Sequence, residues 1–358
     1  MQRCAAIPSW PVSVRGMSDI DLHSIVVGRE AMACRFEVVF NAGEVPRDTE
    51  LAVAALDRVD EIENRISIYR DTSELARINA TAAAGWQPVS HDVFAMLEMA
   101  VDLERRTAGA FDIAAGALVR CWGFLQRQGR TPSDTELAAA IEASGTRWLE
   151  LDREQRRVRF TRPGVEINPG AIGKGWALDR AIDGLAAAGA ASVLMHGGAS
   201  SVRARGTQGP SGPARSGWPV GLRHPLRTDR RIATVRLVDR ALGTSGSGTQ
   251  FFIDRGRRLG HILDPRTGRP AEGVLSATVL APTAAAADAL ATAAYVLGPQ
   301  GLATIAPSGS DVAAIMMVPG AASGAVRMIV ANLEDHLLAI EDGPGVQLER
   351  APSVAAGL

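Results

Sequence analysis

The sequence predicts an α+β fold, because helix and strand patterns alternate in its first half and strand patterns crowd together in its second half. Residues 35–40 alternate as a strand does, and residues 48–66 repeat apolar side chains at helical spacing. From residue 192 onward, short apolar runs are separated by glycine-rich turns. So many adjacent strands argue against a purely parallel, doubly wound sheet.

Composition and charge are those of an ordinary globular protein. The chain has 358 residues, of which 46% are hydrophobic, and 38 Lys and Arg balance 39 Asp and Glu. Because a nucleic-acid binder needs an excess of basic charge, we expect no nucleic-acid partner. No apolar stretch reaches the roughly 18 residues that a transmembrane helix needs, so we also expect no stable membrane insertion.

The two ends of the chain predict little structure. Pro8 and Pro11 interrupt the only candidate for the apolar core of a secretory signal. We therefore expect a disordered leader over 1–23, one domain over 24–335 and a C-terminal tail over 336–358, unfolded from about Gly343, in a cytoplasmic protein. The three cysteines are too widely separated to predict disulfides or structural zinc.

The first half predicts helices interrupted by one hairpin. Beyond 48–66, helical spacing recurs over 91–107 and in a short buried stretch at 112–122. Proline and capping residues at 131–134 begin a further helix, which Gly145 stops. Strand patterns on either side of residues 152–155 predict a hairpin. A helix from Lys174 to Ala188 follows.

The second half predicts mostly strands, with one alanine-rich helix at 284–297 and a loose loop at 207–217. The predicted strands cover residues 192–198, 201–206, 218–224, 232–238, 249–254, 275–281, 311–318 and 325–332.

The sequence contains no complete standard motif for nucleotide binding or hydrolysis. The glycines of Gly170-Ala-Ile-Gly-Lys-Gly175 are too close together for a Walker A loop, and no Ser or Thr follows the lysine. Gly246-Ser-Gly248 leads into a strand and lacks the third glycine of a dinucleotide fingerprint. The sequence also contains neither a complete nucleophile elbow nor His-Glu-x-x-His.

Residues 168–175 form a candidate anion site. Consecutive backbone amides at the start of the following helix suit a bound phosphate, and Lys174 adds a positive charge. The alternative is a tight strand-to-helix turn in which Lys174 is only solvated. Spacing alone leaves both interpretations open.

Asp288 and Thr292 form a candidate metal pair. They lie four residues apart on a helix that is otherwise largely alanine and leucine, so their oxygens face the same side. Such hard oxygen ligands suit Mg²⁺, which completes its shell with water and substrate phosphates. The alternative is an aspartate that stabilises the helix dipole beside a buried threonine.

Seven stretches, in the order of the family's motifs, resemble the ApbE-like FAD:protein FMN transferases, and the resemblance extends from Glu30 to about Val330. The stretches are RVDEIENRISIYRDTSELARIN (58–79), GAFDIAAGALVRCWGF (109–124), INPGAIGKGWALDRAIDGL (167–185), HGGASSVRARG (196–206), GTSGSGTQFF (243–252), HILDPRTGRP (261–270) and SATVLAPTAAAADALATAAYVLG (276–298).

The resemblance implies a single two-lobed α+β unit related to the T-fold. It implies binding of FAD and Mg²⁺ and transfer of FMN from FAD to a Ser or Thr hydroxyl of a target protein, with release of AMP. The target would carry a Ser/Thr-Gly-Ala-Ser/Thr type motif. Two alternatives remain, a Mg²⁺-dependent FAD pyrophosphatase that gives FMN and AMP, and a flavin-binding protein without turnover.

Site residues are carried over by matching motifs. The magnesium ligands would be Asp288, Thr292 and the carbonyl of Gly173. The residues expected to contact FAD are Met32, Tyr69, Ser73, Glu74, Asn79, Lys174, Asp179, Gly197, Gly198, Thr244, Ser245, Gly246 and His261.

His261 is the candidate for proton transfer. An imidazole can take the proton of the target hydroxyl near neutral pH, and Asp264 could orient it or share the task. The alternative is a histidine that only hydrogen-bonds the flavin ring. His196 is a weaker candidate, and the remaining four histidines are expected on the surface or in loops.

Three departures from the family pattern fall in these motifs. Met-Gly-Thr is replaced by Met32-Ala33-Cys34, and the usual aspartate of Asp-x-Gly-Gly is Asn168. Ser247-Gly248 stands where an aromatic residue often follows Thr-Ser-Gly. We therefore expect altered contacts to adenine and pyrophosphate, and weaker magnesium binding because one negative charge is missing.

Overall fold

The computed structural model describes residues 23–209, 217–246, 248, 250–341 and 345–351. All but the last residue of the expected leader, most of the expected loose loop and the last residues of the tail lie outside these ranges. The helices are α1 (Asp48–Ile66), α2 (Glu74–Thr81), α3 (His91–Arg106), α4 (Gly116–Cys121), α5 (Asp134–Glu142), α6 (Gly173–Ala187) and α7 (Ala284–Ile305). The α+β class is confirmed.

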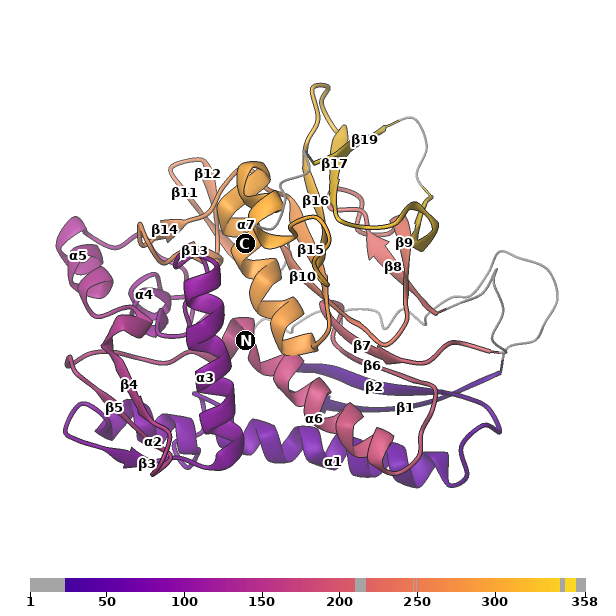
Figure 1. Ribbon diagram of the computed structural model, residues 1–358. Helices are drawn as coiled ribbons and strands as arrows, with labels where there is room; N and C mark the ends of the chain where they lie inside the picture. The colour runs from indigo at the N-terminus through magenta and orange to yellow at the C-terminus, as the bar shows by residue number, and fades with distance from the viewer. Residues whose placement is uncertain (1–22, 210–216, 247, 249, 342–344, 352–358) are drawn as a thin grey trace, which may run out of the picture.

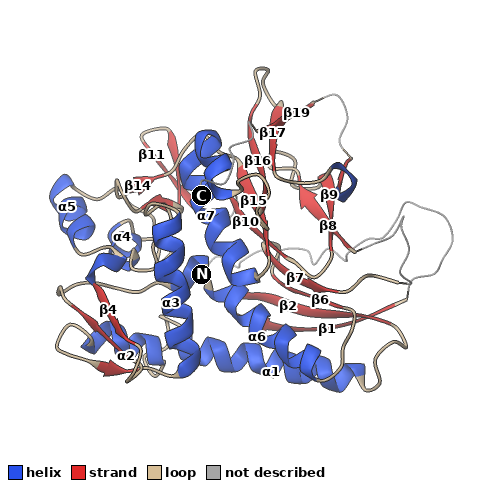
Figure 2. Ribbon diagram, viewed as in Figure 1, coloured by secondary structure: helices blue, strands red, loops and turns tan. Residues whose placement is uncertain are grey.

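A nine-stranded sheet forms the centre of the molecule (Figures 1 and 2). In spatial order its strands are β1 (Ser24–Ala31), β2 (Cys34–Asn41), β6 (Val193–Gly197), β7 (Ser201–Arg205), β10 (Ala241–Gly246), β15 (Ser276–Ala281), β16 (Ala313–Pro319), β17 (Val326–Ala331) and β19 (Val346–Arg350). Neighbours are antiparallel except the parallel pair β17 and β19.

Four smaller sheets surround the central one. They are built from β8 (Trp218–Arg223), β9 (Arg231–Leu237) and β18 (Leu338–Ile340); β3 (Gln87–Pro88), β4 (Leu149–Asp152) and β5 (Arg157–Phe160); β11 (Phe251–Asp254) and β12 (Arg257–Gly260); and β13 (Leu263–Asp264) and β14 (Arg269–Pro270).

Side chains on the two faces of the central sheet belong to two different cores. Phe36, Val38 and Phe40 of β2 pack in a cluster with α1, α3, α6 and α7, whereas the intervening Val39 packs with the β8–β9–β18 sheet. This alternation is the pattern of a strand that is covered on both faces. Figure 1 shows α1, α6 and α7 together on one side of the sheet.

Local signals place most helix ends where the sequence predicts them. Ser133 and Glu136 form a reciprocal capping box at the start of α5. α1 covers 48–66 as predicted and buries residues such as Leu56, Val59 and Ile62. The helix predicted at 284–297 continues to Ile305, but its backbone breaks at Gly298, where φ is 68°. The prediction therefore ended where the helical geometry is interrupted.

Several elements differ from the sequence prediction. β10 is glycine-rich and contains residues that predict a turn, yet it lies near the middle of the central sheet. Gly243 is needed there because a Cβ would lie 2.5 Å from backbone atoms of Ala287 in α7. The expectation that the tail from Gly343 does not fold is wrong for Val346–Arg350, which forms β19 beside β17.

Neither β1 nor α2 was predicted. β1 carries Gly28, Arg29 and Glu30 within its run, which obscures the alternation. Among the helices within the described ranges, none is both long enough and apolar enough to cross a bilayer.

Candidate functional site

A cleft of about 2560 Å³ opens beside the central sheet, and it is called the central cleft below. Its walls come from β2, β6 and β10, the first turn of α6, the middle of α7, and the loops around residues 66–70 and 261–265. The cleft is more than twice the roughly 300–1,000 Å³ of a common small-ligand pocket. Most of the predicted site residues line it.

Two glycines bring Asp288 of α7 into this cleft. A Cβ at Gly175 would lie 2.1 Å from the carbonyl oxygen of Ala284, and one at Gly243 would lie 2.6 Å from the amide nitrogen of Asp288. Because glycine has no Cβ, α6 and β10 can approach α7 closely at these two positions. The Gly175 N–H and the Ser201 hydroxyl then each donate to Oδ2 of Asp288 at 2.9 Å.

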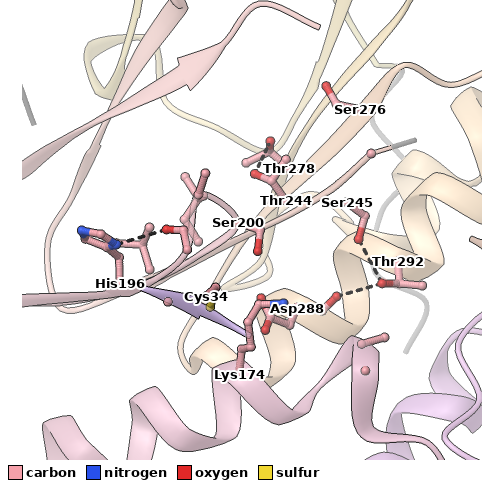
Figure 3. Close-up of a pocket in the computed structure, with 18 of the residues that line it drawn as sticks. Cys34, Lys174, His196, Ser200, Thr244, Ser245, Ser276, Thr278, Asp288 and Thr292 are labelled. Carbon is pink, nitrogen blue, oxygen red and sulfur yellow. Dashed lines mark hydrogen bonds between the residues drawn. The ribbon is translucent and has the colours of Figure 1, made fainter. Parts of the chain in front are cut away.

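Burial raises the pKa of the Asp288 carboxyl to about 6, and the positive charge of Lys174 and the two hydrogen bonds oppose that rise. Figure 3 shows Lys174 from α6 and Asp288 from α7 close together in the cleft. The anion site predicted at 168–175 and the predicted metal pair are thus parts of one site. Asn168 accepts from Gly170 N–H at 2.9 Å and fixes the turn that leads into α6.

Thr292 and Ser245 continue the polar wall from Asp288. The hydroxyls of Ser245 and Thr292 are 2.9 Å apart, and Thr292 donates to the backbone carbonyl of Asp288 at 3.3 Å (Figure 3). Thr244, beside Ser245, shares a hydrogen bond of 2.9 Å with Thr278 of the neighbouring strand β15. Because successive side chains of a strand point to opposite faces of the sheet, Ser245 faces α7 and Thr244 faces the other side.

The oxygen groups at this point fit a hard divalent cation better than a soft one. Both hydrogen bonds to the Asp288 carboxylate go to Oδ2, and within the described ranges none goes to Oδ1. No group of three or more His, Cys, Asp or Glu side chains in those ranges could hold a metal ion. A site here would therefore combine one carboxylate with hydroxyl and carbonyl oxygens, which is the ligand type that Mg²⁺ accepts.

His261 lies on another part of the cleft wall and is oriented by the backbone. Its Nδ1 is 3.1 Å from the carbonyl oxygen of Gln250, which can only accept, so Nδ1 carries the hydrogen. In the neutral ring Nε2 is then the basic atom. Burial lowers the pKa of His261, and the charge of Lys174 lowers it further. The ring of Phe124 packs edge-on against the imidazole, with the two ring centroids 6.4 Å apart.

Asp264 does not orient His261, contrary to the expectation from their spacing. Its carboxylate accepts from the backbone N–H and the guanidinium of Arg266, each at 2.9 Å, and it does not line the central cleft. Its backbone carbonyl closes the following turn by accepting from Gly268 at 2.8 Å. Asp264 stabilises the loop, and the Gln250 carbonyl has the orienting role.

Four residues expected at FAD instead hold the scaffold and do not line the cleft. Asp179 accepts from the first two amides of α7, at 2.8 and 2.9 Å. Ser73 caps α2, and Glu74 binds the backbone and hydroxyl of Ser90. Asn79 exchanges hydrogen bonds with the backbone of Ile167. The other expected contacts line the cleft, namely Met32, Tyr69, Gly173, Lys174, Gly197, Gly198, Thr244, Ser245, Gly246, His261, Asp288 and Thr292.

A charged cluster around Glu37 lines the cleft. Of its residues, only His196 was predicted from the sequence as a site candidate. Nε2 of His196 is 3.0 Å from Glu37, and Arg35 donates to the same carboxylate at 2.7 Å. These partners lower the pKa of Glu37 to about 2, against the effect of burial. Glu37 and His196 are paired across β2 and β6, a contact that only the strand register reveals.

Two further side chains contribute to the cleft wall. Cys34 stands where a threonine is common in the resembling family, and burial raises the pKa of its thiol to about 11. His224 is in a loop as expected, but it is buried, and its Nδ1 accepts from the amides of Leu226 and Arg227. It also lines the cleft.

Comparison with known proteins agrees with this geometry. The sequence profile described as "ApbE family" matches residues 32–316. The FAD:protein FMN transferase of Escherichia coli K12 is 31% identical over 265 residues, which cover 72% of this chain and 74% of the relative. The FAD:protein FMN transferase of Treponema pallidum is 34% identical over 262 residues, covering 68% and 72% of the two chains.

Two solved structures resemble the whole fold. The ApbE protein of Thermotoga maritima has a TM-score of 0.75 at 27% identity, over 85% of this chain and 96% of its own. The flavinyl transferase ApbE of Pseudomonas stutzeri has a TM-score of 0.72 at 28% identity, over 85% and 94%. With the profile match over most of its length and relatives above 30% identity, the chain belongs to the ApbE family.

Proposed function

We propose that this protein is an FAD:protein FMN transferase, which moves FMN from FAD to a Ser or Thr hydroxyl of a target protein and releases AMP. The observation that carries the proposal is the arrangement of the central cleft. One cleft contains a histidine whose Nε2 is the basic ring atom, a lysine at a helix N-terminus and a carboxylate–hydroxyl pair. Storage of a flavin would need neither the histidine nor the carboxylate–hydroxyl pair.

The residues around Lys174 would hold the phosphates of FAD. In the first turn of α6 the Gly175 N–H is bonded to Asp288, whereas the N–H groups of Gly173 and Lys174 have no hydrogen-bond acceptor within the described ranges. The helix dipole favours negative charge at that end. Lys174 adds a full positive charge, and the hydroxyl of Ser245, on the face of β10 toward α7, can donate to a phosphate oxygen. Tyr69, whose side chain is 72% exposed at the cleft, is free to cover a flat ring.

His261 would act on the target hydroxyl. Nε2 accepts the hydroxyl proton while the hydroxyl oxygen attacks the phosphorus of the FMN half of FAD. A new P–O bond forms to the target, and the P–O bond to the bridging oxygen breaks, so AMP leaves with that oxygen and its electron pair. Because burial lowers the pKa of His261, the ring is neutral at pH 7 and can accept the proton.

Asp288, Thr292 and the carbonyl of Gly173 would hold Mg²⁺. When bound, the cation would offset pyrophosphate charge and polarise the phosphorus. The hydrogen bonds from Ser201 and Gly175 fix the Asp288 carboxylate so that one oxygen remains directed to a ligand. Asn168 keeps an oxygen acceptor but not the charge of the aspartate common in the family, and it caps its own turn.

The test uses purified protein with FAD, MgCl₂ and a peptide that carries a Ser/Thr-Gly-Ala-Ser/Thr motif. We expect the peptide to gain the mass of FMN and AMP to appear in equal amount, measured by mass spectrometry and chromatography. Free FMN and AMP with unmodified peptide would instead identify an FAD pyrophosphatase. Intact FAD would identify a binding protein and refute both enzymatic assignments.

A further inference from the structure

The hairpin formed by β11 and β12 extends the wall of the central cleft. β11 and β12 pair only with each other, and within the described ranges no other segment forms backbone hydrogen bonds with them. Gln250, directly before β11, and His261, directly after β12, both line the cleft. A segment lying along the hairpin would therefore lead directly to the proposed base.

The two faces of this hairpin have different environments. Phe252 and Leu259 pack in the core cluster that contains Trp122 and Phe124. On the opposite face, Phe251 is 44% and Ile253 is 67% exposed. A one-sided hairpin would normally be polar on its outer face, so two exposed apolar side chains on one short strand indicate an interaction surface.

The outer edge of β11 is open for strand pairing. The backbone N–H of His261 donates to the backbone carbonyl of Gln250 at 3.2 Å, which makes these two residues a hydrogen-bonded pair of the ladder. Hydrogen-bonded pairs alternate in an antiparallel ladder, so the backbone groups of Phe251 and Ile253 point away from β12. Arg255 and Gly256, with φ of 47° and 77°, form the two-residue turn that this register requires.

The hairpin is also basic. Its turn and second strand carry Arg255, Arg257 and Arg258, against one acidic residue, Asp254, and Arg257 also pairs with Glu272 at 2.9 Å. The guanidinium of Arg258 lies 3.8 Å from the ring centroid of Phe251, on the exposed face. Apolar contacts beside positive charge fit a segment that contains both apolar and acidic side chains.

We propose that the β11–β12 hairpin is the docking surface for the target protein. An extended segment with apolar and acidic residues pairs with the open edge of β11 and continues into the central cleft at Gln250. Its apolar side chain packs on Phe251 and Ile253, and its acidic side chain lies beside the arginines. The hydroxyl to be modified then reaches Nε2 of His261.

This inference rests on the proposed function, because a transferase needs a polypeptide in the same cleft as FAD. Main-chain pairing would give affinity for many targets, and the few side-chain contacts would give the sequence preference. Docking beside His261 also places the hydroxyl within hydrogen-bond reach of the base, roughly 2.6–3.2 Å, without a conformational search.

The experiment compares Ile253→Asp with a matched control, Val26→Asp. Val26 is 53% exposed on β1, which is also an edge strand, and it does not line the cleft. The probe is a fluorescein-labelled synthetic peptide with Asp-Leu before Ser-Gly-Ala-Thr. Peptide binding is measured by fluorescence anisotropy, FMN transfer by mass spectrometry, and FAD binding by flavin fluorescence.

We expect Ile253→Asp to weaken peptide binding and to raise the KM for the peptide by about tenfold or more, because the new carboxylate repels the acidic segment and removes its apolar contact. FAD binding should be unchanged, and Val26→Asp should behave as wild type. The same peptide with methyl groups on alternate backbone amides should bind poorly to the wild-type protein, since it cannot complete a β ladder.

Equal peptide KM in Ile253→Asp and wild type would overturn the docking surface, and equal binding of the methylated peptide would overturn strand pairing. Absence of peptide binding by the wild-type protein would overturn the docking proposal, whatever happens to FAD. Peptide binding that depends on Ile253 without any FMN transfer would leave the docking surface in place and refute the transferase function.

Discussion

Replacing Gly175 by alanine should force α6 away from α7 at the central cleft. A Cβ at this position would lie 2.1 Å from the carbonyl oxygen of Ala284 and 2.5 Å from the amide nitrogen of Ala285. Ordinary contact begins near 3.4 Å, so the two backbones would have to separate by about 1.3 Å. The atoms in the way are backbone atoms of a helix, which no side-chain rotation can move.

The displacement should cost both stability and activity. Overpacking of this kind costs about 1–3 kcal/mol. The Gly175 N–H bond to the buried Asp288 carboxylate, now 2.9 Å, would also lengthen, and a bond to a charged group contributes about 1.5–3 kcal/mol. We expect a loss of about 3 kcal/mol in the free energy of unfolding. A misplacement of about 1 Å at the site should reduce FMN transfer roughly 100-fold.

The matched control is Gly184→Ala in the same helix, where an added Cβ meets no atom within 4 Å. That variant should gain about 0.5–1 kcal/mol, because alanine is the better helix former. Urea unfolding gives the free energies, and mass spectrometry gives the transfer rates. If Gly175→Ala were as stable and as active as Gly184→Ala, the close approach of α6 to α7 would be refuted.

Three further predictions address single groups. Because burial lowers the pKa of His261, kcat/KM for transfer should be constant near neutral pH and should fall only below the pKa of roughly 6.5 of an ordinary imidazole. A pH–rate profile in which kcat/KM already falls above pH 7 would contradict this. Asp179→Asn should lower the free energy of unfolding by about 1–2 kcal/mol, because Asp179 caps α7. The KM for FAD should be unchanged, because Asp179 does not line the cleft. A raised KM for FAD without a loss of stability would support its expected role at FAD. Asp288→Asn should remove the stimulation of transfer by MgCl₂ after treatment with EDTA, and a magnesium response equal to that of wild type would exclude Asp288 as a ligand.

The sequence predicts the parts of the fold that local periodicity determines. α1 repeats apolar residues so regularly that its predicted bounds match the structure, and the capping box of α5 is visible as Ser-x-x-Glu. β10 could not be predicted in the same way, because Gly243 serves a tertiary contact with α7 and, together with Gly246, looks like a turn in the sequence. β19 depends on pairing with β17, which no local pattern reveals.

The sequence likewise predicts the site residues that have local signals, and not the ones whose role depends on tertiary contacts. Residues with short-range sequence signals, such as Lys174 at a helix start and the Asp288–Thr292 pair one helical turn apart, do lie in the cleft. The sequence could not separate Asp179, a carboxylate used as a helix cap, from one used for a ligand. Nor could it show that Asp264 pairs with Arg266, or that Glu37 meets His196 across two strands.

The most direct test of the account compares FMN transfer with FAD binding in His261→Ala. Removal of the base should reduce kcat/KM for transfer about 10²- to 10⁴-fold. The dissociation constant for FAD should stay close to that of wild type, because the start of α6 and Lys174, not His261, would hold the phosphates, and the His261 ring is held by the Gln250 carbonyl. Transfer that persists at the wild-type rate, or that falls only as far as FAD binding falls, would contradict the role of His261 as the base.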